Sequence, residues 1–458
     1  MRRKVCCGLI ASLAIFSATP SNQAQTATAS GSTINAAAKS ALMDACNALL
    51  AASARRPYGM GWSVEGDGAS LQGPTIDLRP GATPAAGLVL FRAGKMLGDS
   101  KLIEDAIAVA HGIALCQRDS GRIADAAIFA RFPSPQDLSP GARDRASSTA
   151  ALGLFLEILN NSPEPDQRIK SAAVRCVTWL TEQQLRDGAW PTELILDDSA
   201  HPDRVYRLDS TDWRNCTMAL LLAGNVLERP TMTQRGEAAC NSLIKLQLSD
   251  AKARWANGAW ASAYRINYSP LKTAGEIPYV LDTVATMHAA QTLLGRFLLT
   301  QDTASSDALT QMAFSMKALR TESGDWYRFY ALPSSPMIAA TRSTQPSTST
   351  SIAPAAAEPS TRVSVASSRP GDQSGMAAPG LGEILAEIDR LQQTGTVDAP
   401  RRYVQEQMAA TLCGLTDMPF VPALQLESHQ KDWQGSWLRL QARAIYSLLD
   451  QMRQADGN

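Results

Sequence analysis

The sequence predicts an all-α fold, namely an α/α toroid of helical hairpins joined at Gly-x-Trp turns. The first observation behind this prediction is a recurring turn signature, Gln-x-x-x-Gly-x-Trp, which is clearest at residues 184–190. Other copies end in Gly-x-Trp, one copy carries Ile in place of Trp, and the first is a looser Gly-Met-Gly-Trp. The turns end at Trp62, Ile123, Trp190, Trp260, Trp326 and Trp437.

The second observation is the nearly constant spacing of these turns. Successive intervals are 61, 67, 70, 66 and 111 residues. The last interval contains a low-complexity insert of about 45 residues, and subtracting this insert restores the period. Six units of this length, each two helices long, predict a closed ring of helical hairpins, because each hairpin buries its apolar face only against its neighbours.

The third observation is that segments rich in Ala and Leu separate the turns and carry apolar residues at helical spacing. Alternating β-branched runs, which indicate strands, are few. Helical sequence resumes at Gly380 after the insert and continues to Gln454. The other predicted helices cover Ala36–Ala54, Thr83–Leu97, Leu102–Cys116, Ser147–Leu159, Ile169–Leu185, Trp213–Leu227, Gln234–Leu246, Val280–Phe297 and Ala308–Leu319.

Each Gly-x-Trp turn is expected to follow the end of one helix and to precede the next helix of the ring. Glycine supplies the positive φ of a helix C-cap, and the tryptophan ring packs back against adjacent hairpins. Packing is therefore the expected role for most of these tryptophans. A minority are expected to line a central cleft and to stack on a ligand.

The chain divides into a signal peptide (1–24), a toroid (25–340), an insert (341–379) and C-terminal helices that complete or pack on the toroid (380–458). The first segment has a basic start at 2–4, a 14-residue uncharged run from Val5 to Ala18 and a candidate cleavage site after Ala24. The insert is dominated by Ser, Thr, Ala, Pro and Gly, so it is expected to be disordered. These features predict a periplasmic or secreted protein.

Composition narrows the possible partners. The chain has 43 basic and 43 acidic residues, and removal of the three basic residues at 2–4 leaves 40 against 43. No basic stripe stands out, so nucleic acid is not an expected partner. No membrane anchor is expected once the signal segment is removed, and a monomer is predicted. The cysteines of the mature chain lie singly on apolar helical stretches, which favours buried free thiols over disulfides.

Familiar catalytic signatures are missing from the sequence. There is no Gly-x-Ser-x-Gly elbow, no His-Glu-x-x-His sequence and no phosphate loop. His111 and His288 lie within Ala-rich helices, where packing is the expected role. The functional prediction therefore depends on other residues.

Several short sequences occur in the same order in a known family. Thr-Ile-Asp at 75–77, followed by Gly-Ala-Thr at 81–83, is similar to a sequence that enters a helix in the pectic acid lyases, polysaccharide lyase family 10. Gly-Ala-Trp-Pro at 188–191 resembles the family's Gly-Gly-Trp-Pro, and residues 58–62 resemble the same sequence at its entry. Trp-Tyr-Arg-Phe-Tyr at 326–330 is similar to its Trp-Ala-Arg-Phe-Tyr. The resemblance covers about residues 58–395.

This resemblance implies a helical toroid that cleaves polygalacturonate-like acidic polymers by calcium-assisted β-elimination. Such chemistry requires a cation or an arginine that neutralises the uronate carboxylate, and a base that removes the C5 proton. By resemblance, Asp77 serves calcium and substrate, and Arg328 pairs with a substrate carboxylate. The further residues assigned to the site are Trp62, Trp190, Arg79 and Arg265 for substrate, and Asp77, Asp209 and Asp212 for calcium.

The sequence departs from the family at several of these points. Leu78, Arg79 and Pro80 follow Asp77 where the family has an asparagine, and no arginine aligns with the family's proton-abstracting arginine, although Arg265 is nearby. Three structural roles stay open as alternatives. Asp77 is then an N-cap or turn residue, Arg328 forms a salt bridge between helices, and Asp212 caps the helix that begins near Trp213.

Other functions also stay open. One alternative is a catalytically inactive relative that binds an acidic polysaccharide or a protein partner. A terpene cyclase shares the tryptophan turns, but this chain has a signal segment and lacks an Asp-x-Asp-Asp motif. A glycoside hydrolase needs two facing carboxylates, for which Glu193 with Asp197 or Asp198 are candidates.

Overall fold

The computed structural model describes residues 27–63, 73–129, 136–137, 145–194, 203–249, 254–271, 273–274, 277–278, 280–321, 324–331, 380–394, 400–417 and 437–455. The predicted signal peptide (1–24) and insert (341–379) lie outside these ranges. Among the described helices, none is both long enough and apolar enough to cross a membrane.

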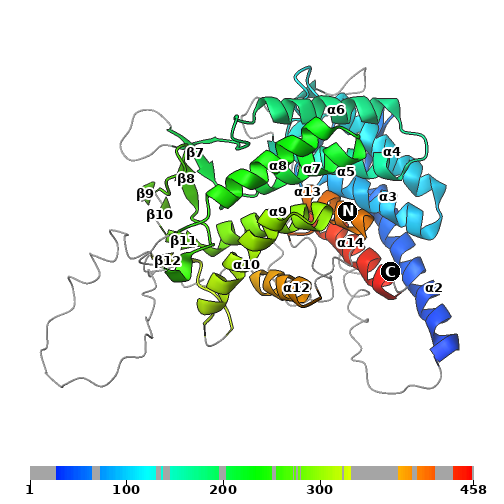
Figure 1. Ribbon diagram of the computed structural model, residues 1–458. Helices are drawn as coiled ribbons and strands as arrows, with labels where there is room; N and C mark the ends of the chain where they lie inside the picture. The colour runs from blue at the N-terminus through cyan, green and yellow to red at the C-terminus, as the bar shows by residue number, and fades with distance from the viewer. Residues whose placement is uncertain are drawn as a thin grey trace, which may run out of the picture.

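Antiparallel helix pairs follow one another around an arc (Figure 1), so the prediction of an all-α, α/α toroid fold is confirmed. The first helix of each pair, here called inner, is buried on almost every side, whereas the second, here called outer, is buried along one stripe. The pairs are α3 (Thr83–Leu97) with α4 (Ser100–Leu115), α5 (Arg145–Asn161) with α6 (Gln167–Glu182), α7 (Asp212–Val226) with α8 (Pro230–Lys245), and α9 (Thr283–Thr300) with α10 (Thr303–Ala318).

Helix α13 (Arg401–Leu412) fills the concave side of this arc, where it packs against α5, α7 and α9. Polar contacts fix it from several sides. Arg92 of α3 donates a hydrogen bond to the Glu406 carbonyl (2.6 Å), and Gly81 donates to the Cys413 carbonyl (2.6 Å) just past the end of α13. A helix thus occupies the centre of the predicted ring.

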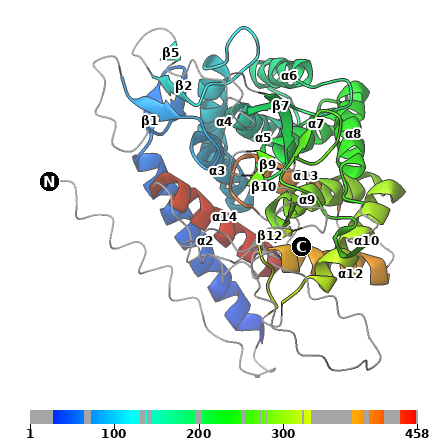
Figure 2. The same ribbon diagram turned by 90° about the vertical axis from the view of Figure 1, so that its left-hand side faces the viewer.

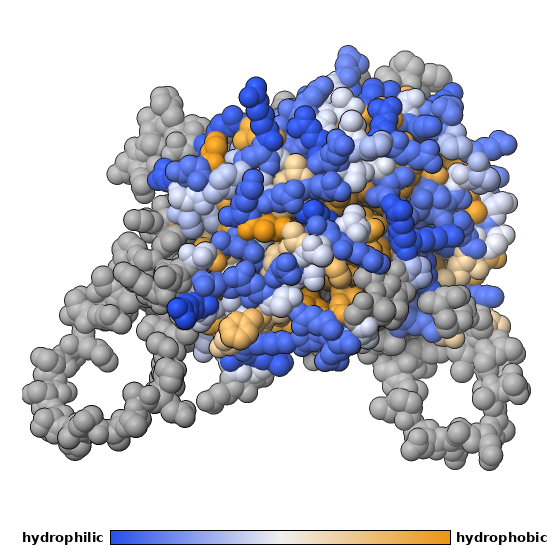
Figure 3. Space-filling view, viewed as in Figure 1, coloured by the Kyte–Doolittle hydropathy of each residue, from blue (hydrophilic) through white to orange (hydrophobic). Residues whose placement is uncertain are grey.

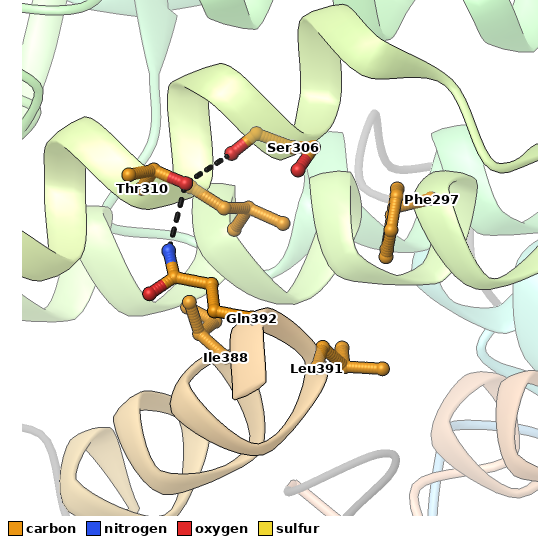
Figure 4. A pocket seen from close by; sticks show the side chains of 7 residues that line it. Phe297, Ser306, Thr310, Ile388, Leu391 and Gln392 are labelled. Atoms are coloured by element: carbon orange, nitrogen blue, oxygen red, sulfur yellow. Dashed lines mark hydrogen bonds between the residues drawn. The ribbon is translucent and has the colours of Figure 1, made fainter. Parts of the chain in front are cut away.

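Three further helices flank the arc. At one end, α14 (Trp437–Ala455) packs against α2 (Ala27–Ala51) and α3 (Figure 2). At the other end, α12 (Leu381–Thr394) packs on α9 and α10. Figure 4 shows this contact, in which Gln392 donates to the Thr310 hydroxyl (2.8 Å) beside Ile388 and Leu391 and a cavity of about 40 Å³.

The Gly-x-Trp turns connect neighbouring outer helices. Gly121, Gly188 and Gly258 have φ angles of 92°, 91° and 90°. Each glycine lies so close to the backbone of the following outer helix that a Cβ atom would overlap it. Glycine is therefore required both for the positive φ and for the close approach.

A glutamine before each of these turns links the same elements. The Gln184 side-chain amide donates to the Gly188 carbonyl (2.8 Å) and to the Arg235 carbonyl in α8 (3.0 Å). Gln117 and Gln247 make the equivalent pair of bonds. The Gln-x-x-x-Gly sequences at Gln117 and Gln184 thus form one hydrogen-bonding unit, and Gln247 makes the same bonds across a longer spacing to Gly258.

The tryptophans anchor each turn to the helix that precedes it. The Trp190 ring is 2% exposed, and its indole N–H donates to the Leu180 carbonyl of α6 (3.0 Å). Trp62, Trp260 and Trp326 make the same kind of bond to Leu49, Leu243 and Met316. These bonds give the tryptophans the packing role that the sequence favours.

Short strands, which the sequence does not predict, lie in the connections between helices. The two-stranded sheets join β1 (Ala54–Arg56) to β2 (Gly59–Gly61), β9 (Thr273–Ala274) to β10 (Ile277–Pro278), and β11 (Val280–Asp282) to β12 (Phe329–Ala331). The three-stranded sheets are β3 (Thr75–Asp77), β4 (Ala126–Ile128) and β5 (Gln136–Asp137), and β6 (Thr192–Leu194), β7 (Asp203–Arg207) and β8 (Ala263–Arg265).

The face of the molecule in Figure 3 is mostly hydrophilic, with apolar residues scattered between charged ones. This surface agrees with outer helices that are buried along a single stripe.

Candidate functional site

The N-terminal ends of the inner helices lie together, because each inner helix is followed by an antiparallel outer one. Strand β7, which precedes α7, lies on the side that faces the viewer in Figure 2. Carboxylates gather there with arginines, and we call this group the crown. Its members are Asp77, Arg79, Asp125, Arg145, Arg207, Asp209, Asp212, Asp282 and Arg328.

Asp77, at the end of β3, is bound by Arg79. Arg79 donates from Nε to Oδ1 (2.9 Å) and from Nη2 to Oδ2 (2.8 Å), and its backbone N–H also donates to Oδ1 (3.0 Å). The Asp77 side chain is buried, whereas 47% of the Arg79 side chain is exposed. The pair therefore presents a fixed guanidinium to solvent.

Arg207 and Asp209 form the same arrangement in reversed sequence order. Arg207 donates from Nε to Oδ1 (2.9 Å) and from Nη2 to Oδ2 (2.6 Å) of Asp209. Here too the carboxylate is buried and the arginine is partly exposed. Asp212, in the first turn of α7, pairs with Arg145 at 2.8 Å. Each carboxylate that the sequence assigns to calcium is thus held by an arginine.

Asp282 caps α9 next to Arg328. One carboxylate oxygen accepts from the backbone N–H of Val284 (2.8 Å), and the other accepts from Ser262 Oγ (2.6 Å). Burial raises the pKa of Asp282, and the hydrogen bond from Ser262 and the positive charge of Arg328 oppose this rise. The Arg328 side chain is exposed, and its guanidinium lies 4.8 Å from the Phe329 ring centre.

A buried cation lies beneath the crown. Arg214 of α7 is 3% exposed and donates to Gln291 Oε1 (2.6 Å), Asn215 Oδ1 (3.1 Å) and the Asp417 carbonyl (3.4 Å). These acceptors are neutral, and burial lowers the pKa of Arg214 to about 10. The buried charge adds positive potential to this end of the molecule.

The positive charge of Arg214 also acts on His288 of α9. Its Nδ1 lies 3.0 Å from the Leu208 carbonyl. Burial and then the charge of Arg214 lower the pKa of His288 to about 4, against the smaller effects of the Leu208 carbonyl, Asp417 and Asp209. The side chain is therefore neutral at pH 7, as expected for a packing histidine.

The residues predicted for the site do not all come together. Asp209 and Arg328 both lie near Asp282, since its pKa responds to both charges. Among the described residues, no hydrogen bond or ion pair links Asp77 to Arg328. Arg265, at the end of β8, is exposed.

The rings of Trp62 and Trp190 are each 2% exposed. In this structure neither ring has a face that a sugar can reach, so their predicted role in substrate binding has no support. The alternative carboxylates Asp197 and Asp198 lie outside the described residues.

Sequence reasoning did not find Arg145, Arg207 or the buried Arg214. A signal for one of them was present, because Asp-Leu-Arg at 77–79 and Arg-Leu-Asp at 207–209 are mirror sequences that stand before the inner helices α3 and α7. The central leucines, Leu78 and Leu208, are buried in both. Successive side chains of an extended segment point to opposite faces, so a leucine between two charged residues places both charged side chains on the face opposite its own.

Cysteines take no part in this site. Cys46, Cys116, Cys176, Cys216, Cys240 and Cys413 are all buried and free. Burial raises the pKa of the Cys176 and Cys240 thiols to about 12. These groups are therefore protonated packing residues, as the sequence favours.

No protein-family model and no curated protein sequence matches this chain. The chain is distantly similar in structure to α/α toroid enzymes that act on glycans. A heparin-specific unsaturated glucuronyl hydrolase is 10% identical, with 93% of this chain and 97% of that chain covered and a TM-score of 0.43. The family 10 polysaccharide lyase from Cellvibrio cellulosa is 15% identical, with 55% and 83% covered and a TM-score of 0.38.

The unsaturated glucuronyl hydrolase from Bacillus sp. GL1 is 12% identical, with 55% of this chain covered and a TM-score of 0.37. The chain spans 61% of the length of that hydrolase. All three are distant likenesses of fold, and the reaction has to be argued from the residues of this chain.

Proposed function

We propose that this protein binds an acidic polysaccharide of the polygalacturonate type at the crown, through arginines and without calcium. The observation that carries the proposal is the clamping of buried carboxylates by partly exposed arginines, seen at Asp77 with Arg79 and at Asp209 with Arg207. This is the non-catalytic alternative that the sequence left open.

The paired arginines suit a uronate carboxylate. A guanidinium has five N–H donors in a planar fork. Arg79 uses Nε and Nη2 for Asp77, so its remaining donors are available on the exposed side. The buried aspartate also fixes the side chain, which reduces the entropy lost on binding.

Two further features favour an anionic ligand. Arg328 has an exposed guanidinium, and no described residue accepts a hydrogen bond from it. Arg214 adds a buried positive charge whose hydrogen-bond acceptors are neutral, and the charge of Asp417 acts on it. The crown contains five carboxylates and four arginines, so the proposed attraction does not depend on net charge but on Arg79, Arg207 and Arg328 being accessible while their neighbouring carboxylates are buried.

Calcium does not fit the described residues. Calcium takes six to eight oxygen ligands, which are carboxylates, carbonyls and waters. Asp77, Asp209 and Asp212 are each engaged by a different arginine. In the described part of the chain, no group of three His, Cys, Asp or Glu residues is placed to hold a metal ion. The proposed binding therefore does not depend on calcium.

Cleavage by β-elimination is the second candidate function, because an arginine can neutralise the uronate carboxylate in place of calcium. Exposed Arg328 supplies such a cation. The reaction also needs a base that reaches the C5 proton. Arg214 has a lowered pKa of about 10, but it is buried and its donors are bound to Gln291, Asn215 and the Asp417 carbonyl. Binding is consequently better supported than turnover.

Affinity electrophoresis tests the proposal. The protein is run through gels that contain polygalacturonate or an uncharged galactan, both with a chelator present. We expect retardation in the polygalacturonate gel alone and weaker retardation of the Arg79→Ala variant. Equal mobility in both gels contradicts the proposal.

A companion assay separates binding from cleavage. The same protein is incubated with polygalacturonate while near-ultraviolet absorbance is followed, because β-elimination creates an absorbing unsaturated uronate. A rising absorbance establishes the second function, and a flat trace with retarded mobility establishes a binding protein. The predicted periplasmic or secreted location, where such polymers occur, remains part of the proposal.

A further inference from the structure

Large apolar side chains are rarely exposed in the described part of the chain, and two of the exposed ones adjoin predicted site arginines. Tyr327 is 42% exposed and precedes Arg328, and Ile266 is 41% exposed and follows Arg265. Phe314, on outer helix α10, is exposed far more, at 72%. Single exposed apolar residues are common on protein surfaces, so Tyr327 is of interest for its position beside an arginine, since a ligand site combines apolar area with a few polar groups.

The preceding turn shows that the fold does not require an aromatic ring at Tyr327. In that turn, Ala261 donates its backbone N–H to the Tyr264 hydroxyl (2.7 Å). Tyr327 makes the same bond to the Tyr330 hydroxyl (3.0 Å). Ala261 is 1% exposed, so a small buried residue satisfies the same backbone geometry.

The neighbouring positions are equivalent as well, and both lie close to Asp282. Ser262 follows Ala261 and donates to the Asp282 carboxylate (2.6 Å). Arg328 follows Tyr327, and its charge acts on the same carboxylate. In the second copy, an alanine and a serine are thus replaced by an exposed tyrosine and an exposed arginine.

Tyr327 is held firmly. Its carbonyl accepts a hydrogen bond from Thr283 Oγ1 (3.2 Å), at the start of α9. Its ring meets the ring of buried Tyr330 edge to face, with centres 6.1 Å apart and planes at 72°. Tyr330 is in turn fixed by a hydrogen bond to the Leu319 carbonyl (3.0 Å). A ring that is fixed before binding loses little entropy when a ligand covers it.

We infer that Tyr327 and Arg328 form one uronate subsite, in which the sugar ring lies on the tyrosine and its carboxylate pairs with the arginine. This inference rests on the proposed function. It also supplies the accessible aromatic surface that buried Trp62 and Trp190 do not offer. The apolar face of a pyranose ring covers an aromatic ring, whereas the carboxylate requires a cation at its edge.

Titration calorimetry with tri-galacturonate, in a chelator, tests this subsite in the full chain. We expect Tyr327→Ala to weaken binding by about tenfold, which corresponds to roughly 1.4 kcal/mol. We expect Tyr327→Phe to bind within about twofold of the wild type, because stacking needs the ring and not the hydroxyl. Phe314→Ala is the matched control, since it removes an exposed ring from another surface, and its affinity is expected to be unchanged.

A fluorescence reading separates stacking from a structural effect. The Tyr327→Trp variant is titrated with tri-galacturonate, which is expected to change indole emission, and with an uncharged galactan trisaccharide, which is not. Wild-type binding that persists unchanged in Tyr327→Ala overturns the subsite and leaves the proposed function standing. Absence of wild-type binding overturns both.

Discussion

Arg79 donates hydrogen bonds to both carboxylate oxygens of Asp77, at 2.9 and 2.8 Å, so the residue predicted to bind calcium already has a cationic partner two positions along the chain. Arg207 and Asp209 repeat this pairing before α7. The same pairing thus occurs twice, just before the N-terminal ends of α3 and α7. In each case a buried carboxylate fixes the position of a partly exposed guanidinium group.

The two supported arginines are expected to contribute to binding independently. We predict that Arg207→Ala weakens polygalacturonate binding by about tenfold or more, because hydrogen bonds to charged groups contribute roughly 1.5–3 kcal/mol. Asp209→Asn is expected to weaken it less, since the guanidinium remains but loses its support. Calorimetry measures both. An Arg207→Ala affinity equal to that of the wild type would remove Arg207 from the site.

The close approach of Gly188 to α8 predicts a large loss of stability on substitution. Gly188 and Gly324 share a φ of 91°, so alanine is strained equally at both positions. At Gly188 the new Cβ also overlaps the backbone of Ala238, whereas at Gly324 it meets only the Arg320 side chain, at 3.3 Å. We expect Gly188→Ala to lower the free energy of unfolding by about 2 kcal/mol more than Gly324→Ala, as overpacking does. Urea unfolding measures the difference, and equal losses would show that α8 adjusts freely.

A buried ion pair holds α3, α5 and α13 together. Arg92 pairs with Glu157 at 3.0 Å, and both side chains are less than 10% exposed. We predict that Glu157→Gln lowers the free energy of unfolding by about 3 kcal/mol, because it removes the ionic partner of a buried arginine and leaves only the Glu406 charge to act on it. Lys317→Ala, which breaks an exposed pair with Asp389, is the control and is expected to cost less than about 1 kcal/mol. Similar losses in both variants would contradict a buried role for Arg92.

His288 makes stability depend on pH. Its pKa is lowered from 6.5 to about 4 in the folded protein. Between these values the unfolded chain binds more protons, so the free energy of unfolding rises with pH from about 4 to 6.5 and falls on acidification. The expected loss is about 3 kcal/mol, from the size of the shift. Unfolding of the wild type and of His288→Gln is compared at several pH values. An undiminished slope in the variant would assign the dependence to other groups.

The helices could be predicted from the sequence because their causes are local. Thr83–Leu97 has the predicted bounds, with Pro84 in its first turn and a left-handed C-cap at Gly98. The start of α9 was missed because residues 280–282 instead pair with β12, which follows more than forty residues later. Strands as short as β3 carry no periodicity that a sequence reveals.

The packing position of α13 and the ion pairs of the site could not be predicted, because both depend on contacts between segments that are distant in the sequence. The apolar pattern of residues 401–412 indicates a helix but does not show that it packs against α5, α7 and α9. The residue types of the site were partly recognised, since Asp209 and Arg328 both lie near Asp282. The pairing of Asp212 with Arg145 joins distant segments and becomes visible only in the fold.

We propose that arginines, and not calcium, hold an acidic polymer at the crown. The most direct test is a calorimetric titration of the wild-type protein with tri-galacturonate, first with a chelator and then with calcium in excess. We expect binding in the chelator with an affinity that calcium changes by less than about twofold, because Asp77, Asp209 and Asp212 are already paired. Binding that appears only when calcium is added would contradict it.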